Sequence, residues 1–170
     1  MRIGSGLRAA GLALALFWTA GCGGSGGTGP STNGLYVRFR VDGAQVEYTS
    51  QASLLAAFGQ AGNQRSMTAS GFDAASNFSL TVFDGSVITA KTYSGYDINV
   101  GLGVAVGALL VYEDPGGTVF SAGSGTIDHS VEILELTSSI VRGRFTGTLK
   151  AAGQQDRMLT HGEFRVQRVN

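Results

Sequence analysis

The sequence predicts an all-β fold, an antiparallel β-sandwich or barrel-like domain of about eight to ten strands that spans residues 34–170. Two observations predict it. Apolar and polar side chains alternate with a period of two through most of this region, which is typical of strands with one buried face. Clusters of Gly, Asp, Ser and Pro separate these runs, and no helical segments alternate with them. We therefore expect one domain built from antiparallel strands.

The first expected strands form a hairpin. Residues 35–41 place Leu, Val, Phe and Val on one face, and Asp42-Gly43 supplies the tight turn before a return strand at 44–48. The other expected strands, in chain order, are 78–82, 87–93, 98–107 with 109–112, 118–121, 125–127, 131–136, 141–150 and 162–169.

Residues 98–107 carry branched apolar side chains on one face and mainly Gly, Ala and Asn on the other. A nearly bare face favours close approach of another layer, an aromatic ring or a ligand. Only residues 50–58 look helical, because Ser50 or Ser53 can cap a helix, Leu54 and Phe58 share a face, and Gly59 can end it. The pattern leaves open whether this segment is a helix.

Composition and charge narrow the class of protein. Of the 170 residues, 43% are hydrophobic and only 14% are charged, which excludes a disordered polyelectrolyte and allows a packed core. The 12 Lys and Arg balance 12 Asp and Glu, so no nucleic acid partner is expected. The single Cys excludes an internal disulfide framework and a multi-cysteine zinc site, and we expect no cofactor.

The N-terminus is predicted to be a signal peptide over residues 1–21, with Arg2 and Arg8 before an apolar run at 9–20. This run is short of the roughly 20 apolar residues that a membrane-spanning helix needs. Residues 22–33 are rich in Gly and Ser and are predicted to form a flexible tether.

Thr19-Ala20-Gly21-Cys22 resembles the lipobox of bacterial lipoproteins. The resemblance implies that Cys22 carries a diacylglycerol and an amide-linked fatty acid such as palmitate, and several acyl chains hold a protein stably at a membrane. Gly rather than Asp follows the cysteine, which in this class favours the outer membrane. The alternative is ordinary cleavage that leaves Cys22 free.

The body of the chain resembles a family of uncharacterised bacterial lipoproteins with a β-rich domain. The likeness lies in Lys91-Thr92-Tyr93, in residues 124–127 (Ser-Gly-Thr-Ile), in residues 141–149 with Gly-x-Phe spacing, and in residues 161–166 (His-Gly-Glu-Phe-Arg-Val). These motifs are strand and turn spacings, so the resemblance implies a fold, and no catalytic residue follows from it.

The best candidate ligand-binding segment is the predicted loop that contains Tyr93, Tyr96, Asp97 and Asn99. Tyrosine combines a large apolar face with a polar tip, and the Asp and Asn side chains can hydrogen-bond a sugar or a peptide. The alternative is that these tyrosines cover the end of the core.

Other candidate chemistry is weaker. A zinc site would need His129 and His161 to converge with Asp128 or Glu163, and we expect both histidines at the surface instead, with no metal site. The pair Glu113-Asp114 precedes a turn in which acidic residues are normally solvated. Glu132 and Glu135 are expected on opposite faces of one strand, which would keep them from acting on one substrate.

These observations predict a lipid-anchored protein of the outer membrane, facing the periplasm or the cell surface. We expect a non-enzymatic binding or structural module that contacts the membrane through its anchor and takes a glycan or an envelope protein as partner. The alternatives are an envelope hydrolase and a carrier that holds a small apolar ligand inside a barrel.

Overall fold

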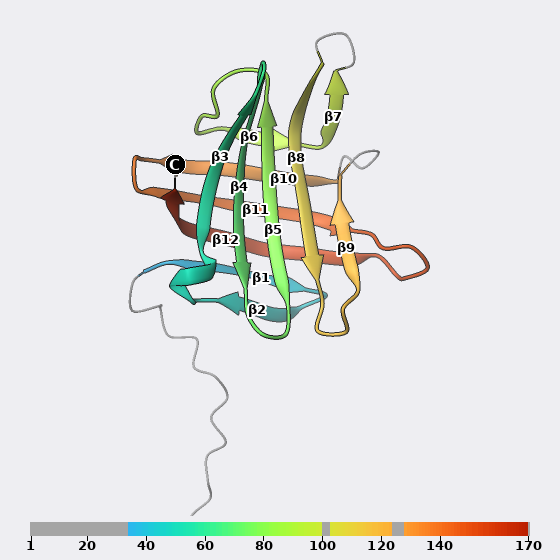
Figure 1. Ribbon diagram of the computed structural model, residues 1–170. Helices are drawn as coiled ribbons and strands as arrows, with labels where there is room; N and C mark the ends of the chain where they lie inside the picture. Colours follow the sequence, from blue (N-terminus) through green and yellow to red (C-terminus); the bar gives the residue numbers. More distant parts are fainter. Residues whose placement is uncertain (1–33, 100–102, 124–127, 170) are drawn as a thin grey trace, which may run out of the picture.

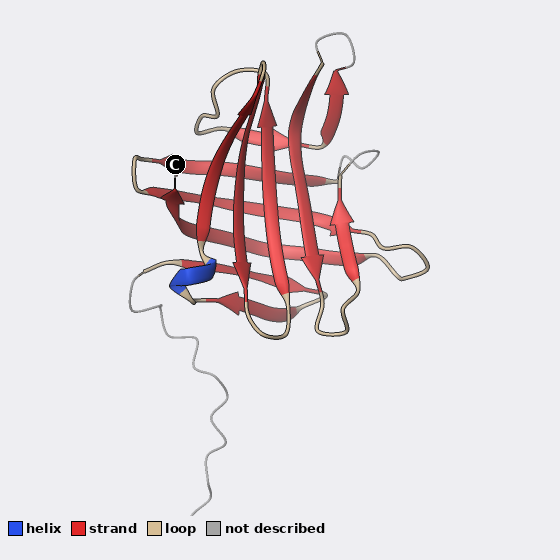
Figure 2. Ribbon diagram, viewed as in Figure 1, coloured by secondary structure: helices blue, strands red, loops and turns tan. Residues whose placement is uncertain are grey.

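The computed structural model describes residues 34–99, 103–123 and 128–169. Within them the chain is almost entirely β-structure, which confirms the predicted all-β class (Figure 2). The strands are β1 (Tyr36–Val41), β2 (Ala44–Tyr48), β3 (Leu55–Ala61), β4 (Gln64–Phe72), β5 (Asn77–Asp84), β6 (Thr92–Ser94), β7 (Tyr96–Asn99), β8 (Val104–Glu113), β9 (Val119–Ala122), β10 (His129–Leu136), β11 (Ile140–Leu149) and β12 (Arg157–Val169).

The strands form two layers that cross each other (Figure 1). One layer contains β3, β4, β5, β8 and β9, and β10, β11, β12 and β1 run crosswise behind it. Hydrogen bonding is continuous in the order β6-β10-β11-β12-β3-β4-β5-β8-β7, and the corner between the layers is the parallel pairing of β12 with β3. The sheet is not closed, so the fold is an open sandwich of the barrel-like kind predicted above.

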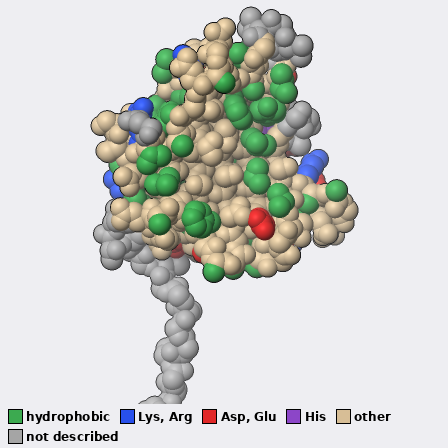
Figure 3. Space-filling model, in the orientation of Figure 1, with side chains coloured by type: hydrophobic (Ala, Val, Ile, Leu, Met, Phe, Trp, Pro, Cys, Tyr) green, Lys and Arg blue, Asp and Glu red, His purple; other side chains and the backbone are tan. Residues whose placement is uncertain are grey.

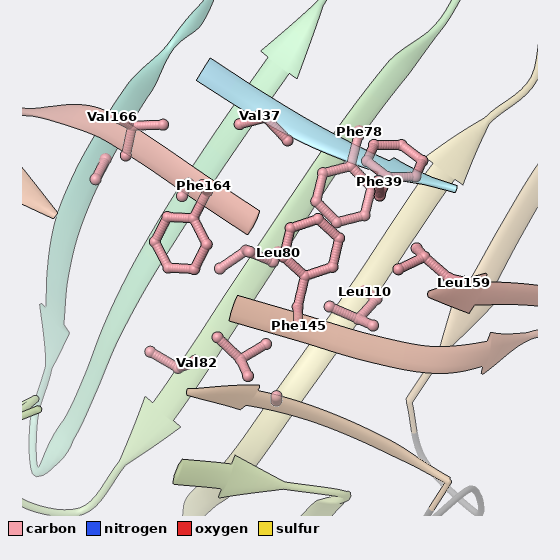
Figure 4. Close-up of a cluster of buried hydrophobic side chains, with 14 of the residues drawn as sticks. Val37, Phe39, Phe78, Leu80, Val82, Leu110, Phe145, Leu159, Phe164 and Val166 are labelled. Carbon is pink, nitrogen blue, oxygen red and sulfur yellow. The ribbon is translucent and has the colours of Figure 1, made fainter. Parts of the chain in front are cut away.

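A cluster of phenylalanines fills the space between the layers (Figure 4). The ring of Phe78, from β5, lies with its centroid 4.7 Å from that of Phe39 on β1 and 4.7 Å from that of Phe145 on β11. Phe164 on β12 lies 6.3 Å from Phe145. One layer therefore inserts an aromatic ring between two rings of the other, which ties the crossing strands together.

Two glycines make room for these rings. In the β11–β12 ladder Phe145 lies opposite Gly162, and Phe164 lies opposite Gly143. A Cβ atom added to Gly162 would lie 2.5 Å from the Phe145 ring, and one added to Gly143 would lie 2.6 Å from the Phe164 ring. The Gly-x-Phe spacing of these strands is therefore a reciprocal packing device, in which each ring lies across the neighbouring strand's glycine.

The possible helix at residues 50–58 is absent. Gln51–Ser53 form one 3-10 turn, and β3 begins at Leu55 (Figure 2). Leu54 and Ala56 are fully buried, and β3 pairs with both β12 and β4. Positions 54 and 58 fit a period of two as well as a helical period, and pairing on both edges outweighs the weak local helical preference.

Two expected strands differ in extent, and a third is not tested. Residues 98–107 contribute to two strands, since β7 ends at Asn99 and β8 begins at Val104. The expected strand at 87–93 is reduced to β6, and residues 125–127 lie outside the described part of the chain. At Gly107 the φ angle is 107°, and an added Cβ would collide with the carbonyl of Gly95, so this glycine admits the close approach of the main chain that precedes β7.

Among the described residues, no helix is long and apolar enough to cross a membrane. The predicted signal peptide, Cys22 and the tether at 22–33 lie outside the residues that the structure describes.

Candidate functional site

The predicted binding loop consists of two short strands joined at Gly95. Tyr93, in β6, is buried, and its hydroxyl both accepts a hydrogen bond from the Thr89 amide at 2.9 Å and donates one to the Thr89 carbonyl at 3.1 Å. The ammonium group of Lys91 lies 4.9 Å from the centre of its ring. Tyr93 therefore packs in the core and supports the segment before it.

The other three residues of this segment lie on β7. The Tyr96 ring is half-buried and meets the Phe83 ring edge-on at 5.3 Å between centroids. Asp97 is exposed, and Asn99 ends the strand. The four candidate residues are therefore divided between a buried tyrosine on β6 and an exposed edge strand, and they do not form one continuous tyrosine surface.

His129 is buried, which corrects the prediction that both histidines lie at the surface. Its side chain is only 3% exposed, and Nε2 lies 2.6 Å from the carbonyl oxygen of Ala108 on β8. Because a carbonyl only accepts, Nε2 carries the proton in this bond. His129 faces Gly147 across the ladder, where the missing Cβ leaves room for it. This histidine thus links the two layers from inside the core.

His161 is exposed on the outer side of β12. It has a φ angle of 53°, a left-handed conformation that a residue with a side chain seldom adopts. The pairing register of β12 shifts here on both sides, between Arg38 and Arg40 of β1 and between Phe145 and Gly147 of β11. A β-bulge therefore turns this side chain outward at the centre of the layer, and such bulges often re-aim side chains at binding sites.

A row of alternating charges crosses four strands beside this bulge. Arg38 on β1 lies opposite Glu163 on β12, Glu163 opposite Arg144 on β11, and Arg144 opposite Glu132 on β10. Arg38 donates to Glu163 at 2.6 Å, and this hydrogen bond raises the pKa of the arginine. The outward side chains of β1, β12, β11 and β10, including this row and His161, are called the charged face below.

Two hollows flank His161 on the charged face. One, of about 230 Å³, is lined by Arg40, Gln45 and Glu163 together with the histidine. The other, of about 270 Å³, is lined by Ser130, Glu132, Arg144, Thr146 and the same histidine. The structure therefore brings charged and hydrogen-bonding groups to both sides of one exposed imidazole.

The second hollow contains the residue types of a hydrolytic triad. A triad needs a histidine hydrogen-bonded to both the nucleophile and the carboxylate. Among the described residues, no hydrogen bond joins His161 to Ser130 or to Glu132. The three side chains share a surface hollow without the bonds that would make a nucleophile of the serine.

Glu132 and Glu135 lie on the same face, contrary to the prediction. A register shift between Ile133 and Glu135 inserts one extra residue in β10, so that Glu132 faces Arg144 and Glu135 faces Arg142, both on the outer side. Glu135 accepts a hydrogen bond from Arg142 at 3.1 Å. The simple alternation rule fails at a bulge, because the extra residue restores the same orientation.

The remaining predicted acidic and metal-binding groups have structural contacts. Glu113 accepts a hydrogen bond from Asn77, and Asp114 accepts the amides of Gly116 and Thr118 at 2.9 Å each, which closes the β8–β9 turn. No group of three or more His, Cys, Asp and Glu side chains suited to a metal ion occurs in the described part of the chain. The buried His129 and the exposed histidine of the bulge are kept on opposite sides of one layer.

The opposite outer face is nearly free of charge. Figure 3 shows few charged side chains over β3, β4, β5 and β8. Its outward positions are mostly hydroxyl-bearing or apolar, and Thr68 and Thr81 share a hydrogen bond at 3.0 Å across β4 and β5. The two faces therefore differ sharply in the kind of partner that each can recognise.

Comparisons with protein-family models, with curated proteins and with solved structures find no match to this chain.

Proposed function

We propose that this protein is a lipid-anchored module of the outer membrane that binds a polar partner, a glycan or an envelope protein, through the charged face. The observation that carries the binding role is the left-handed bulge that presents His161 between two hollows. Backbone strain of this kind costs on the order of 1–3 kcal/mol and tends to occur at functional sites.

The anchor is supported by the position of the lone cysteine in the lipobox-like sequence. A fatty-acid labelling experiment in a bacterial host tests it, because Cys22→Ala removes the only thiol. We expect labelled palmitate in the wild-type protein and none in the variant, with the variant released or unprocessed. Label that persists in Cys22→Ala would overturn the anchor.

The charged face is tested by binding to isolated glycans and envelope proteins. His161→Asn is the sharpest variant, because Asn tolerates the left-handed backbone and the bulge is kept. We expect this variant and Arg144→Ala to weaken binding, while Ser121→Ala, an exposed change on β9 in the other layer, leaves it unchanged. Equal binding by all four proteins would discard the charged face as the site.

A second candidate function is an envelope hydrolase, because Ser130, Glu132 and His161 line one hollow. Turnover of a p-nitrophenyl ester by the wild-type protein, lost in Ser130→Ala with unchanged far-UV circular dichroism, would favour this activity. Identical rates in the two proteins would dismiss it.

A further inference from the structure

One of the two hollows of the charged face, the one of about 230 Å³, contains three hydrogen-bond donors without a partner in the described part of the chain. They are the Arg40 guanidinium, the Gln45 side-chain amide and the His161 imidazole, and all three side chains are exposed. Gln45 lies opposite Arg40 in the β1–β2 ladder, and β12 pairs with the other edge of β1. This hollow, called the Arg40 hollow below, therefore offers three N–H groups to one ligand.

The only carboxylate that lines the Arg40 hollow already has a cationic partner. Glu163 accepts hydrogen bonds from Nε of Arg38 at 3.1 Å and from its terminal nitrogen at 2.6 Å, so these two charges compensate each other. Glu47 lies opposite Arg38 in the β1–β2 ladder and does not line the hollow. Arg40 has no salt bridge with any described residue. The hollow therefore has an excess of positive charge and favours an anionic group.

The hollow on the other side of His161 has a different character. Glu132 and Arg144 both line it and face each other across the β10–β11 ladder, but neither has a salt bridge or a side-chain hydrogen bond with a described residue. Ser130 and Thr146 add two hydroxyl groups. The opposite charges leave this hollow, called the Ser130 hollow below, without a net charge. Its mixture of donors and acceptors suits the hydroxyl groups of a neutral sugar.

The size and lining of the two hollows indicate one unit of a longer polar ligand in each. Their volumes of about 230 and 270 Å³ are below the roughly 300–1,000 Å³ of common small-molecule sites. Because His161 lines both, a ligand that crosses this histidine reaches both hollows. The large apolar side chains that line them, Phe39 and Phe145, are only 2% and 3% exposed. The hollows thus lack the accessible aromatic anchors that dominate binding between proteins, which favours a glycan over a protein partner.

We propose that the charged face binds an acidic glycan in which a sugar that carries a carboxylate is linked to a neutral sugar. The carboxylate accepts hydrogen bonds from Arg40, Gln45 and His161, and the neutral sugar occupies the Ser130 hollow. A guanidinium suits this group because its donors match the geometry of a carboxylate. The inference rests on the proposed function, since it names the class of glycan that the charged face recognises.

The test is calorimetric titration of the full chain, held in nanodiscs of zwitterionic phosphatidylcholine, with empty nanodiscs as the reference. The ligand is a tetrasaccharide of alternating glucuronic acid and N-acetylglucosamine, and its methyl ester is the uncharged counterpart. We expect saturable binding of the acid and binding of the ester that is about tenfold weaker, the loss of one charge-assisted interaction. An ester that binds as tightly as the acid, or an acid without saturable binding beyond the empty discs, would overturn the inference.

Two variants locate the carboxylate. Arg40→Gln should weaken binding of the acid about tenfold. Gln45→Glu, which has nearly the same shape, places a carboxylate opposite Arg40 in the β1–β2 ladder and should weaken this binding at least as much. Arg65→Gln, the same change on β4 and outside both hollows, should leave it intact. Equal affinity of the Arg40→Gln and Arg65→Gln proteins for the acid, both folded by circular dichroism, would refute this location.

Arg144→Ala separates this inference from the proposed function, because Arg144 does not line the Arg40 hollow. If acid and ester bind equally and both are lost in Arg144→Ala, the preference for a carboxylate is wrong and the charged face still binds glycans. If neither saccharide binds and an envelope protein binds in an Arg144-dependent way, the acidic glycan is likewise wrong and the proposed function stands. Acid binding that is weakened in both Arg40→Gln and Arg144→Ala would support the two proposals together.

Discussion

Substitution of Gly162 by alanine tests the packing device of β11 and β12. The φ angle of this glycine lies outside the left-handed region, so alanine suits the backbone and the effect is steric. The new Cβ would lie 2.5 and 2.6 Å from ring carbons of Phe145, and still closer to the Phe145 carbonyl oxygen. Neither group has room to retreat, because the ring stacks on Phe78 and β11 is paired on both edges.

The expected destabilisation follows from these contacts. Overpacking of a well-packed core costs typically about 1–3 kcal/mol, and we expect about 3 kcal/mol here because one of the opposing atoms belongs to the backbone. This is a large fraction of the roughly 5–15 kcal/mol by which a domain of this size is stable. Gly143→Ala should cost a similar amount, since its Cβ would meet the Phe164 ring and the Glu132 carbonyl.

The assay is equilibrium unfolding in urea followed by far-UV circular dichroism. Tryptophan fluorescence would not report on the domain, because the single Trp lies at position 18 in the predicted signal peptide. Gly85→Ala is the matched control, since its Cβ would lie 3.4 Å from the nearest atom, an ordinary contact. If the free energy of unfolding of Gly162→Ala lies within about 0.5 kcal/mol of that of Gly85→Ala, the reciprocal packing described above is wrong.

Three further substitutions give distinct outcomes in urea or pH titrations. His129→Ala should cost about 2–4 kcal/mol in urea unfolding, because it empties core space and removes the donor to a carbonyl of β8. Hydrogen bonds from Arg157 and the amide of Met158 lower the pKa of Asp42, so its ionised form stabilises the fold at neutral pH and this contribution disappears as pH falls through that pKa. Asp42→Asn should therefore lower the urea midpoint at pH 7 and have little effect at pH 2; an equal effect at both would contradict the assignment. Burial raises the pKa of Tyr48 from 10.0 to about 12, despite its hydrogen bond to Ser76. Because the tyrosine ionises at a lower pH in the unfolded chain, the free energy of unfolding should fall as pH rises from 10.0 to about 12. Tyr48→Phe should make this loss of stability shallower, as measured by the urea midpoint at each pH, and an unchanged loss would contradict the assignment.

Strong alternation predicted much of the sheet. Nearly all of residues 35–41 and 44–48, and all of 78–82 and 141–149, lie in strands as expected. Apolar side chains recur at every second position in the first three, and in 141–149 they share the buried face with glycines. β4 was not predicted, since its buried positions include Ala69 and Gly71, which are too small to give an apolar signal. The β3 segment was ambiguous for the opposite reason, because its large residues fit two periods at once.

The site residues were harder to predict because they depend on register. Nothing in the local sequence around His161 shows that two ladders shift at this residue, and only the pairing with β1 and β11 makes it a bulge. Similarly, the extra residue in β10 brings Glu132 and Glu135 to one face. The Asp42-Gly43 sequence marks a turn with positive φ angles, whereas His161-Gly162 carries no comparable sign that the φ angle of the histidine is positive.

Strands β11 and β12 contribute side chains both to the core and to the charged face. Along β11, Val141, Gly143 and Phe145 are buried, and Arg142 and Arg144 between them are exposed. A slip of one residue would place both arginines in the core, so the alternation fixes the register strongly. Ion pairing contributes little to the stability of the row of alternating charges, however. Arg144 makes no salt bridge or side-chain hydrogen bond with any described residue. The surface pair Arg38–Glu163 is worth at most about 1 kcal/mol. Substitutions on the charged face should therefore change the free energy of unfolding only slightly. A loss of binding in Arg144→Ala would then report recognition rather than stability.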